Sequence, residues 1–361
     1  SQAALFASSE ICQLLSMLVD DSKIAGAQVA VGSVDAPMLL KSVGRQSVDR
    51  GEPIDDDTRF CIGSCSKMFA AAVVLALESQ GKLKLDVPID EWLDEFSSLE
   101  IEGNGEATRA PTLHELLCHR SGVYTQRNRM TMTQTRWIRD FKLSLSASVA
   151  GIGSELLIAE PGNRFAYSGA GYCVLGRVAE VAGERAFDQL LSAHICRPLG
   201  LTATSYFVPA GVDNVAVGHR IVNGKLVVSK SSPHLLGTRH KLVLVGGSIY
   251  CSAREAARFA QMMIGQGTLG ERAVLTRAQW QLMTTPQTPD DQGGYGFGIR
   301  VAIDKMTGKK TVLSHGGALS GYFSYMLMDL QTKRFGVVHY TGGRQTAQVL
   351  KALQSWVSSP R

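Results

Sequence analysis

The sequence predicts an α+β protein in which both ends of the chain build one antiparallel sheet and a mostly helical lobe is inserted between them. Three observations support this class. Residues 27–34 and 38–43 read as two alternating strands of a hairpin. After residue 295 the chain alternates again in runs separated by turn residues, as in an antiparallel meander. Between these ends, several stretches have helical apolar spacing.

The elements follow in order along the chain. A buried helix is expected from Met68 to Glu78, closed by Gly81. Thr112 and Glu115 have the spacing of a capping box at the start of a short helix. Further helices are expected over residues 10–20, 173–182, 186–196, 253–264 and 345–357. Strands are expected over residues 215–228, around an Asn-Gly turn, and over 296–303, 311–314, 322–330 and 335–340.

Composition narrows the class of protein. A chain of 361 residues can bury a large core, and 45% hydrophobic with 19% charged residues is ordinary for a globular enzyme. The net charge of +5 is small and the basic residues are scattered, so nucleic acid is not an expected partner. No run reaches the roughly 20 apolar residues of a membrane helix. Seven dispersed cysteines favour reduced thiols and a cytoplasmic location.

One short motif carries a chemical hypothesis. Ser64 and Lys67 stand at i and i+3 where a turn enters the buried helix, so their side chains share one face. A lysine kept neutral by its surroundings can take the proton of a serine hydroxyl and make it nucleophilic. The same pattern recurs at Ser79 and Lys82, but Ser79 lies next to the expected helix end and is interpreted as a surface residue.

Two further motifs complete a resemblance. The three motifs, in order, are Ser64-Cys65-Ser66-Lys67, Tyr167-Ser168-Gly169 and His315-Gly316-Gly317. Together with the stretches around them, they make the chain resemble the penicillin-recognising serine hydrolases of the class C β-lactamase type, over nearly its whole length. That group includes DD-peptidases, D-aminopeptidases, esterases and acyltransferases. The resemblance implies a β-lactamase/transpeptidase-like fold that uses no metal and no organic cofactor.

The resemblance also implies roles for individual residues. Ser64 would be the nucleophile that carries the acyl group, and Lys67 would hold or take its proton. Tyr167 would be the partner of the lysine, with the division of the general-base role left open. His315 would lie on a strand at the opposite wall, and the backbone N–H groups of Ser64 and Ala318 would form the oxyanion hole.

Four more residues are expected to bind substrate, namely Ser168, Gly169, Gly316 and Gly317. Two positions depart from the β-lactamase pattern: His315 replaces a lysine, and Gly169 replaces an asparagine that normally contacts the substrate amide. Both departures argue against an efficient β-lactamase. The remaining histidines, His119 among them, are expected to be structural.

These inferences predict a serine hydrolase that acts through an acyl-enzyme on an ester or amide of a small acylated metabolite. The alternatives are an acyltransferase, a D-stereospecific peptidase, or a non-catalytic binding protein on the same fold. Residues 1–62 and 231–361 should form a sheet-plus-helix domain and residues 63–230 the helical lobe, with the active site between them. The segment 124–153, rich in Thr, Arg and Ser, is expected to be a lid or substrate-facing insertion. The oligomeric state is left open.

Overall fold

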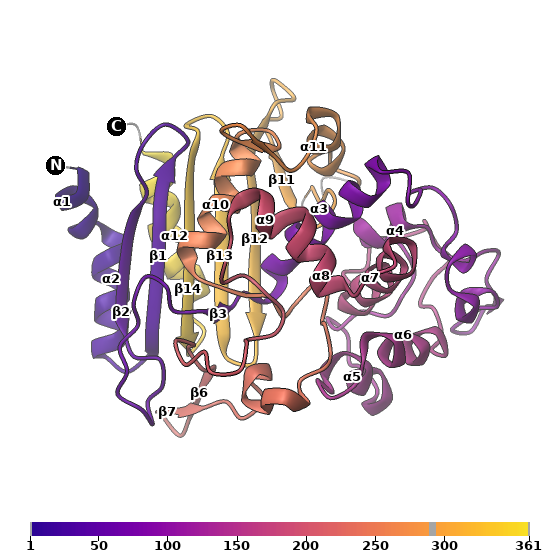
Figure 1. Ribbon diagram of the computed structural model, residues 1–361, viewed down its shortest axis with the longest axis horizontal. Helices are drawn as coiled ribbons and strands as arrows, with labels where there is room; N and C mark the ends of the chain where they lie inside the picture. Colours follow the sequence, from indigo (N-terminus) through magenta and orange to yellow (C-terminus); the bar gives the residue numbers. More distant parts are fainter. Residues whose placement is uncertain (1, 289–293, 360–361) are drawn as a thin grey trace.

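The protein is built on a six-stranded antiparallel sheet with the strand order β11-β12-β13-β14-β1-β2. The structure, a computed structural model, describes residues 2–288 and 294–359. Strand β1 pairs with β14 on one side and β2 on the other, so both ends of the chain complete the sheet, as predicted (Figure 1). The strands are β1 (Ile24–Ser33), β2 (Leu39–Gly44), β11 (Arg300–Ile303), β12 (Lys310–Leu319), β13 (Tyr322–Asp329) and β14 (Arg334–Gly342).

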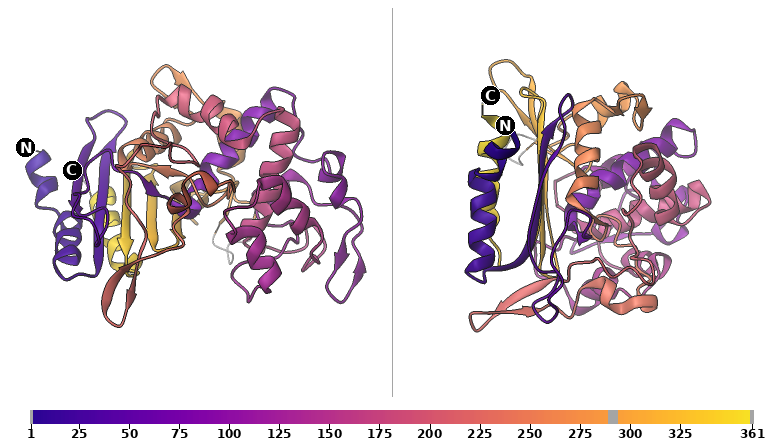
Figure 2. Two further views of the ribbon diagram at one scale, coloured as in Figure 1. Left: turned by 60° about the horizontal axis from the view of Figure 1, so that its bottom comes forward. Right: turned by 60° about the vertical axis from the view of Figure 1, so that its left-hand side comes forward.

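Helices cover both faces of this sheet (Figure 2). Helices α2 (Glu10–Asp20) and α12 (Thr346–Ser358) pack together on one face, and α10 (Ala253–Ile264) packs on the other against β1, β13 and β14. Because both faces of β1 are covered, its residues 24–31 are all buried. Each fully buried Val or Ile side chain there stabilises the fold by roughly 1.5–3 kcal/mol.

The helical lobe surrounds α3 (Ser66–Ser79), in which residues 66–77 are all buried. Helix α3 packs against α7 (Gly169–Gly183), which in turn packs against α4 (Leu113–Leu117). The predicted capping box of α4 is present, with Thr112 and Glu115 each bonded to the other's backbone N–H. The remaining helices are α1 (Gln2–Ala7), α5 (Met132–Arg139), α6 (Leu145–Gly153), α8 (Phe187–Leu191), α9 (Arg197–Leu199) and α11 (Arg277–Met283).

Short strand pairs complete the fold. The predicted Asn-Gly hairpin is confirmed: Asn223 and Gly224 have φ values of 50° and 76°, as its tight turn requires. The pairs are β3 (Phe60–Cys61) with β8 (Tyr250–Cys251), β4 (Glu100–Ile101) with β5 (Gly105–Glu106), β6 (His219–Val222) with β7 (Lys225–Val228), and β9 (Thr268–Leu269) with β10 (Arg272–Ala273).

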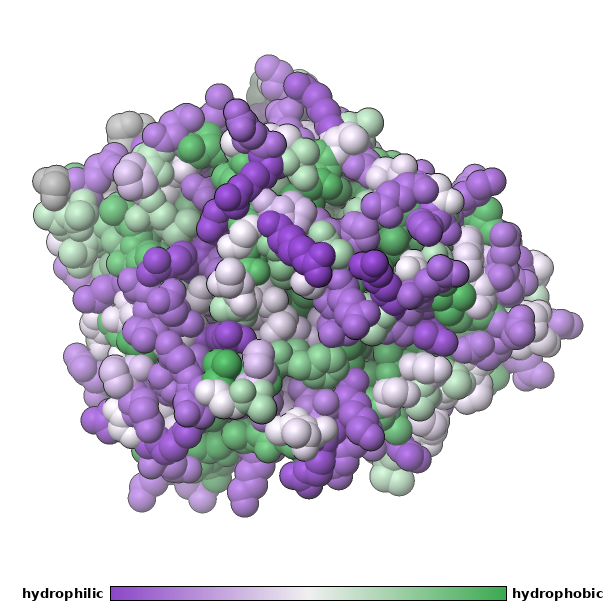
Figure 3. Space-filling model, in the orientation of Figure 1, coloured by the Kyte–Doolittle hydropathy of each residue, from purple (hydrophilic) through white to green (hydrophobic). Residues whose placement is uncertain are grey.

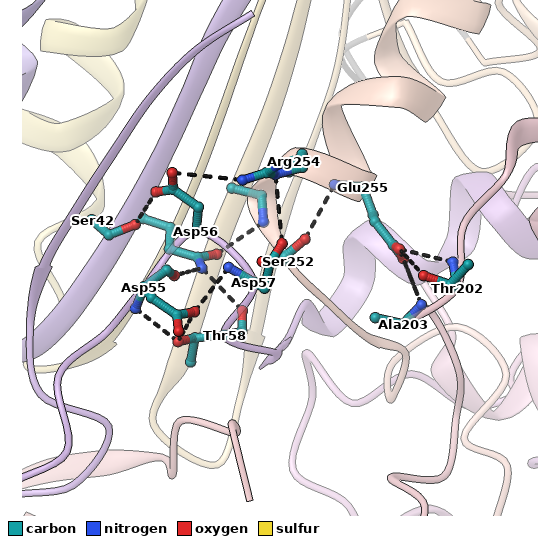
Figure 4. Close-up of polar contacts among 12 residues, drawn as sticks. Ser42, Asp55, Asp56, Asp57, Thr58, Thr202, Ala203, Ser252, Arg254 and Glu255 are labelled. Carbon is teal, nitrogen blue, oxygen red and sulfur yellow. Dashed lines mark hydrogen bonds and ion pairs between the residues drawn. The ribbon is translucent and has the colours of Figure 1, made fainter. Parts of the chain in front are cut away.

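A buried carboxylate ties the loop after α9 to α10 (Figure 4). Glu255, only 8% exposed, accepts hydrogen bonds from the backbone N–H groups of Thr202 (2.8 Å) and Ala203 (3.0 Å). It also accepts one from the hydroxyl of Thr204 at 2.5 Å. Ser252 caps α10 by accepting from the N–H of Glu255. Buried polar groups that are satisfied in this way hold a loop in one position.

The segment 124–153 contains the helices α5 and α6, which its weak apolar periodicity did not predict. Helix α5 starts with a capping box between Thr131 and Gln134, so local polar bonding defines it. Helix α6 packs closely on α5: a Cβ added at Gly151 would lie only 2.4 Å from the ring of Trp137, so only a glycine fits there. The role of the segment as a lid and the domain limits at residues 62 and 231 stay predictions.

All seven cysteines are free and buried, in agreement with the expected thiols. In the described part of the chain, none of the helices has the length and apolar character needed to cross a bilayer. Hydrophilic side chains cover much of the face drawn in Figure 3, with apolar residues dispersed among them.

Candidate active site

Ser64 lies in a single 3₁₀ turn, Gly63–Cys65, that leads directly into α3. Gly63 has a φ of +53°, and a Cβ at this position would stand 2.5 Å from the backbone nitrogen of Ala318. A Cβ at Gly317 would similarly stand 2.0 Å from the carbonyl oxygen of Ile62. The two glycines therefore let the Ser64 turn press against β12 and place the N–H of Ala318 beside it.

Lys67 points from the first turn of α3 to the serine. Its Nζ lies 3.2 Å from the Oγ of Ser64 and donates to the carbonyl oxygen of Gly246 at 2.9 Å. The side chain is 1% exposed. Nζ also lies 4.7 Å from the ring centre of Tyr167 and 5.3 Å from that of Tyr172. The serine, the lysine and the tyrosine of the first two motifs are thus brought together.

Tyr167 is held in place by the N-cap of α7. The next residue, Ser168, caps this helix by accepting from the N–H of Gly171 at 2.9 Å, and it donates to the carbonyl oxygen of Tyr124 at 2.6 Å. Because the Ser168 hydroxyl is buried and engaged within the protein, it acts here as a support for Tyr167. The guanidinium of Arg127 covers the Tyr167 ring at 4.4 Å.

Gly169 is accompanied by a glutamine, Gln126, that none of the sequence motifs predicted. The N–H of Gly169 donates to Oε1 of Gln126 at 2.8 Å. A Cβ at Gly169 would lie 3.4 Å from Nε2 of Gln126, so the glutamine carboxamide occupies the space into which a longer side chain would extend. Where the resemblance implies an asparagine amide, the structure therefore supplies the amide of Gln126 from another loop.

His315 lies on β12 with both ring nitrogens engaged. Nδ1 is 2.7 Å from the carbonyl oxygen of Gly316, which can only accept, so Nδ1 carries the proton. Nε2 therefore accepts from the hydroxyl of Tyr295 at 2.9 Å. Burial and, after it, the charge of Lys67 lower the pKa of His315 to about 3. At neutral pH this histidine is an uncharged part of the cavity wall.

The chain of hydrogen bonds continues to His119. The backbone N–H of Ser168 donates to Nδ1 of His119 at 3.0 Å, so Nε2 carries the proton and donates to Tyr295 at 3.3 Å. Burial holds the pKa of His119 well below its usual value. Tyr295 thus links the histidine beside Tyr167 to the histidine on β12. Tyr295 was not predicted from the sequence, because its two partners are distant along the chain and no local pattern marks it.

Ser64 opens into a cavity of about 440 Å³. Gly316 and Gly317 line it, whereas Ser168 and Gly169 are not among its lining residues. The lining is made of Ser64, Gln126, Arg127, Tyr167, Arg300, His315, Gly316, Gly317, Ala318, Phe323, Ser324, Tyr325, Arg344 and Thr346. A larger hollow of about 680 Å³, between α1 and α12, contains none of these groups.

Two other features bear on the chemistry. Burial raises the pKa of the Cys65 thiol, next to the serine, to about 12, so the thiol stays protonated and does not compete as a nucleophile. Among residues 2–288 and 294–359, no group of three or more His, Cys, Asp or Glu side chains is arranged to hold a metal ion.

Comparison with known proteins identifies the class. The family model described as Beta-lactamase matches residues 12–354, and the chain belongs to this family. Protein Rv1367c of Mycobacterium tuberculosis (strain ATCC 25618 / H37Rv) is 26% identical over 329 residues, which cover 85% of this chain and 81% of that protein. Esterase EstB of Burkholderia gladioli is 29% identical over 208 residues, which cover 55% of this chain and 50% of the esterase.

Among solved structures, the chain is similar to EstCE1, described as a hydrolase with promiscuous acyltransferase activity. The TM-score is 0.82 at 21% identity, and the match covers 98% of this chain and all of that one. This similarity confirms the predicted β-lactamase/transpeptidase-like fold. Family membership and the esterase relative indicate an enzyme of the serine hydrolase or acyl-transfer kind.

Proposed function

We propose that the protein is a serine hydrolase that forms an acyl-enzyme on Ser64 from an ester or amide of a small acylated metabolite. The observation that carries this proposal is the 3.2 Å contact between the buried Nζ of Lys67 and the Oγ of Ser64, at the edge of a cavity large enough for a small acyl group. A serine that a basic group contacts in this way is the arrangement that nucleophilic catalysis requires.

The proposed reaction has two steps. In the first, the Oγ of Ser64 attacks the acyl carbon while its proton passes to Lys67 or Tyr167, and the backbone N–H groups of Ser64 and Ala318 receive the developing oxyanion. The leaving group then departs with a proton from the same pair of residues. In the second step, water attacks the ester on Ser64, the C–O bond to the serine breaks, and the serine recovers its proton. Which of Lys67 and Tyr167 is the base stays open.

Weak turnover of β-lactams is part of this proposal. His315, which stands where the β-lactamases have a lysine, is neutral and turns both nitrogens to protein groups. It therefore supplies no cation at that point of the wall. The amide that the β-lactamase pattern has at position 169 comes here from Gln126, so this part of the proposal rests on the neutral His315.

An acyltransferase is the second candidate. Its support is the similarity to EstCE1 over the whole of both chains, since that protein is described as a hydrolase with promiscuous acyltransferase activity. The two candidates share the acyl-enzyme and differ in whether water or another nucleophile receives the acyl group.

Intact-protein mass spectrometry tests the acyl-enzyme. Wild type, Ser64→Ala and Ser79→Ala are exposed to a fluorophosphonate and, separately, to p-nitrophenyl acetate. We expect one adduct on wild type and on Ser79→Ala and none on Ser64→Ala, because Ser79 is the exposed serine of the second, chance motif. If the folded wild type forms no adduct, the result would contradict the hydrolase and favour a non-catalytic binding protein. Faster loss of the acetyl group to added alcohols or amines than to water would favour the transferase.

A further inference from the structure

Three arginines line the cavity of Ser64, each from a different part of the chain. Arg127 lies in the loop between α4 and α5, Arg300 begins β11, and Arg344 follows β14. The lining residues include no aspartate or glutamate. Within the described part of the chain, none of the ion pairs involves these arginines. Their charges are therefore not cancelled by a described carboxylate.

Each of these guanidinium groups lies over an aromatic ring. Arg127 is 4.4 Å from the ring centre of Tyr167, Arg300 is 5.7 Å from that of Tyr295, and Arg344 is 5.2 Å from that of Phe323. A ring face holds a guanidinium in place without removing its charge and leaves the N–H groups at its edge free to donate. The arrangement thus orients three cations at one cavity.

The field of two of these arginines reaches the catalytic wall. The charges of Arg300 and Arg127 both contribute to lowering the pKa of His315, after burial and the charge of Lys67. Arg300 is half-buried, while Arg127 and Arg344 are exposed at the mouth. A cavity whose walls carry one sign of charge concentrates ligands of the opposite sign. The fork of a guanidinium also matches the paired oxygens of a carboxylate or phosphate.

We propose that the acyl substrate carries an anionic group, a carboxylate or a phosphate, which Arg127, Arg300 and Arg344 bind while Ser64 attacks the acyl carbon. This inference rests on the proposed function and adds the substrate class to it. The three arginines take the role that a lysine on β12 has in the β-lactamase pattern, but from three positions around the cavity instead of one point on the strand. Its binding involves no covalent change.

Matched pairs of esters test the proposal. The first pair is the p-nitrophenyl half ester of adipic acid and its neutral methyl ester, which have the same chain length and differ in one charge on the acyl side. The second pair is 4-acetoxybenzoate and its methyl ester, in which the charge lies on the leaving group. A further ester, 4-acetoxyphenyl phosphate, has a phosphate on the leaving group in place of the carboxylate. We expect at least one anionic ester to exceed its neutral partner about tenfold or more in kcat/KM.

Substitution of the arginines assigns this preference. For the preferred anionic ester, Arg300→Gln and Arg344→Gln should each raise KM about ten- to a hundredfold with a smaller change in kcat. For the neutral ester the rise in KM should be smaller, so the ratio of kcat/KM between the anionic and the neutral ester should fall. Arg220→Gln is the matched control, because Arg220 is exposed on β6 and does not line the cavity.

The outcomes separate this inference from the proposed function. If every neutral ester acylates Ser64 as fast as its anionic partner, or if the arginine variants leave the ratio unchanged, the anionic substrate class is refuted while the hydrolase stands. If no ester acylates Ser64, the hydrolase fails. Calorimetric titration of adipate and of phenyl phosphate into wild type and the two arginine variants then decides the anion site, which is refuted by the absence of binding that depends on the arginines.

Discussion

Replacement of Tyr295 by phenylalanine removes one hydroxyl from the centre of the active-site wall. The ring stays, and with it the contacts of that ring with His119, Phe165, Tyr167 and His315. Two hydrogen bonds disappear: one that the hydroxyl accepts from His119 at 3.3 Å and one that it donates to His315 at 2.9 Å. Since Tyr295 is fully buried, two imidazole nitrogens lose their partner away from solvent.

The expected cost follows from these two groups. An unsatisfied buried donor or acceptor costs about 1–3 kcal/mol. The longer bond to His119 belongs at the low end of this range and the shorter bond to His315 at the high end. Together they predict a decrease of about 2–4 kcal/mol in the free energy of unfolding. The His315 ring then keeps only its Nδ1 hydrogen bond and is held less firmly, so kcat/KM for p-nitrophenyl acetate should fall at least about tenfold, because catalysis depends on groups held in place.

Urea denaturation and ester kinetics on wild type and Tyr295→Phe measure both effects. Tyr322→Phe is the control, because its hydroxyl is also buried and donates to the carbonyl oxygen of Ala216 at 2.7 Å, but Tyr322 does not line the cavity. The control should lose stability and keep its kcat/KM. Equal stability and equal activity of wild type and Tyr295→Phe would refute the hydrogen-bonded chain as a support of the site.

Three further outcomes are expected. Burial lowers the pKa values of His219, His234 and His339 to about 4 and that of His315 to about 3. The unfolded chain therefore binds more protons below pH 6.5, and the free energy of unfolding should fall as the pH drops from 6.5 towards 4, by up to about 5 kcal/mol per pH unit. Fluorescence during acid titration measures this loss. A free energy of unfolding that does not change down to pH 4 would contradict the expectation. Gly63→Ala should lower kcat/KM about a hundredfold, because a Cβ there displaces β12. Gly81→Ala is the control in the same ester assay, because Gly81 also has a positive φ but a Cβ there would meet open space. Equal losses of kcat/KM in the two variants would contradict the explanation. Glu255→Ala should lower the free energy of unfolding by about 3–5 kcal/mol, because buried donors lose their acceptor. In urea denaturation, Glu255→Gln should recover part of this loss. A Glu255→Ala variant as stable as wild type would show that water replaces the carboxylate.

Much of the fold could be predicted because its signals are local. The limits of α2 and α10, the capping box of α4 and the hairpin at Asn223 agree with the sequence pattern. Helices α5 and α6 were missed because polar caps and small residues define them, and neither feature gives a regular apolar stripe. The alternating pattern alone ended this strand at Ser314, since two glycines interrupt it, whereas the family resemblance correctly placed His315 on the strand that runs on to Leu319.

Only the residues of the site that belong to the three sequence motifs could be predicted. The i, i+3 spacing of Ser64 and Lys67 predicted their contact, since a helical turn brings these positions together. Tyr295, Gln126 and the arginines contribute through contacts between loops that are distant in the sequence. No local pattern marks such residues, so their roles are visible only once the fold has placed them. The catalytic roles themselves stay predictions until the adducts are measured.

The pairing of β1 with β14 has a consequence for how the chain reaches its native state. Ile24 is opposite Gly342, so nearly the whole sequence separates two strands that lie side by side. During synthesis, the edge of β1 that pairs with β14 stays unpaired until β14, the last strand, has been made. Contacts between residues so far apart in the sequence also form slowly. An open strand edge invites pairing with other chains. Loss of β14 and α12 should therefore turn a protein that folds into one that aggregates, even though Ser64 and Lys67 would still be present.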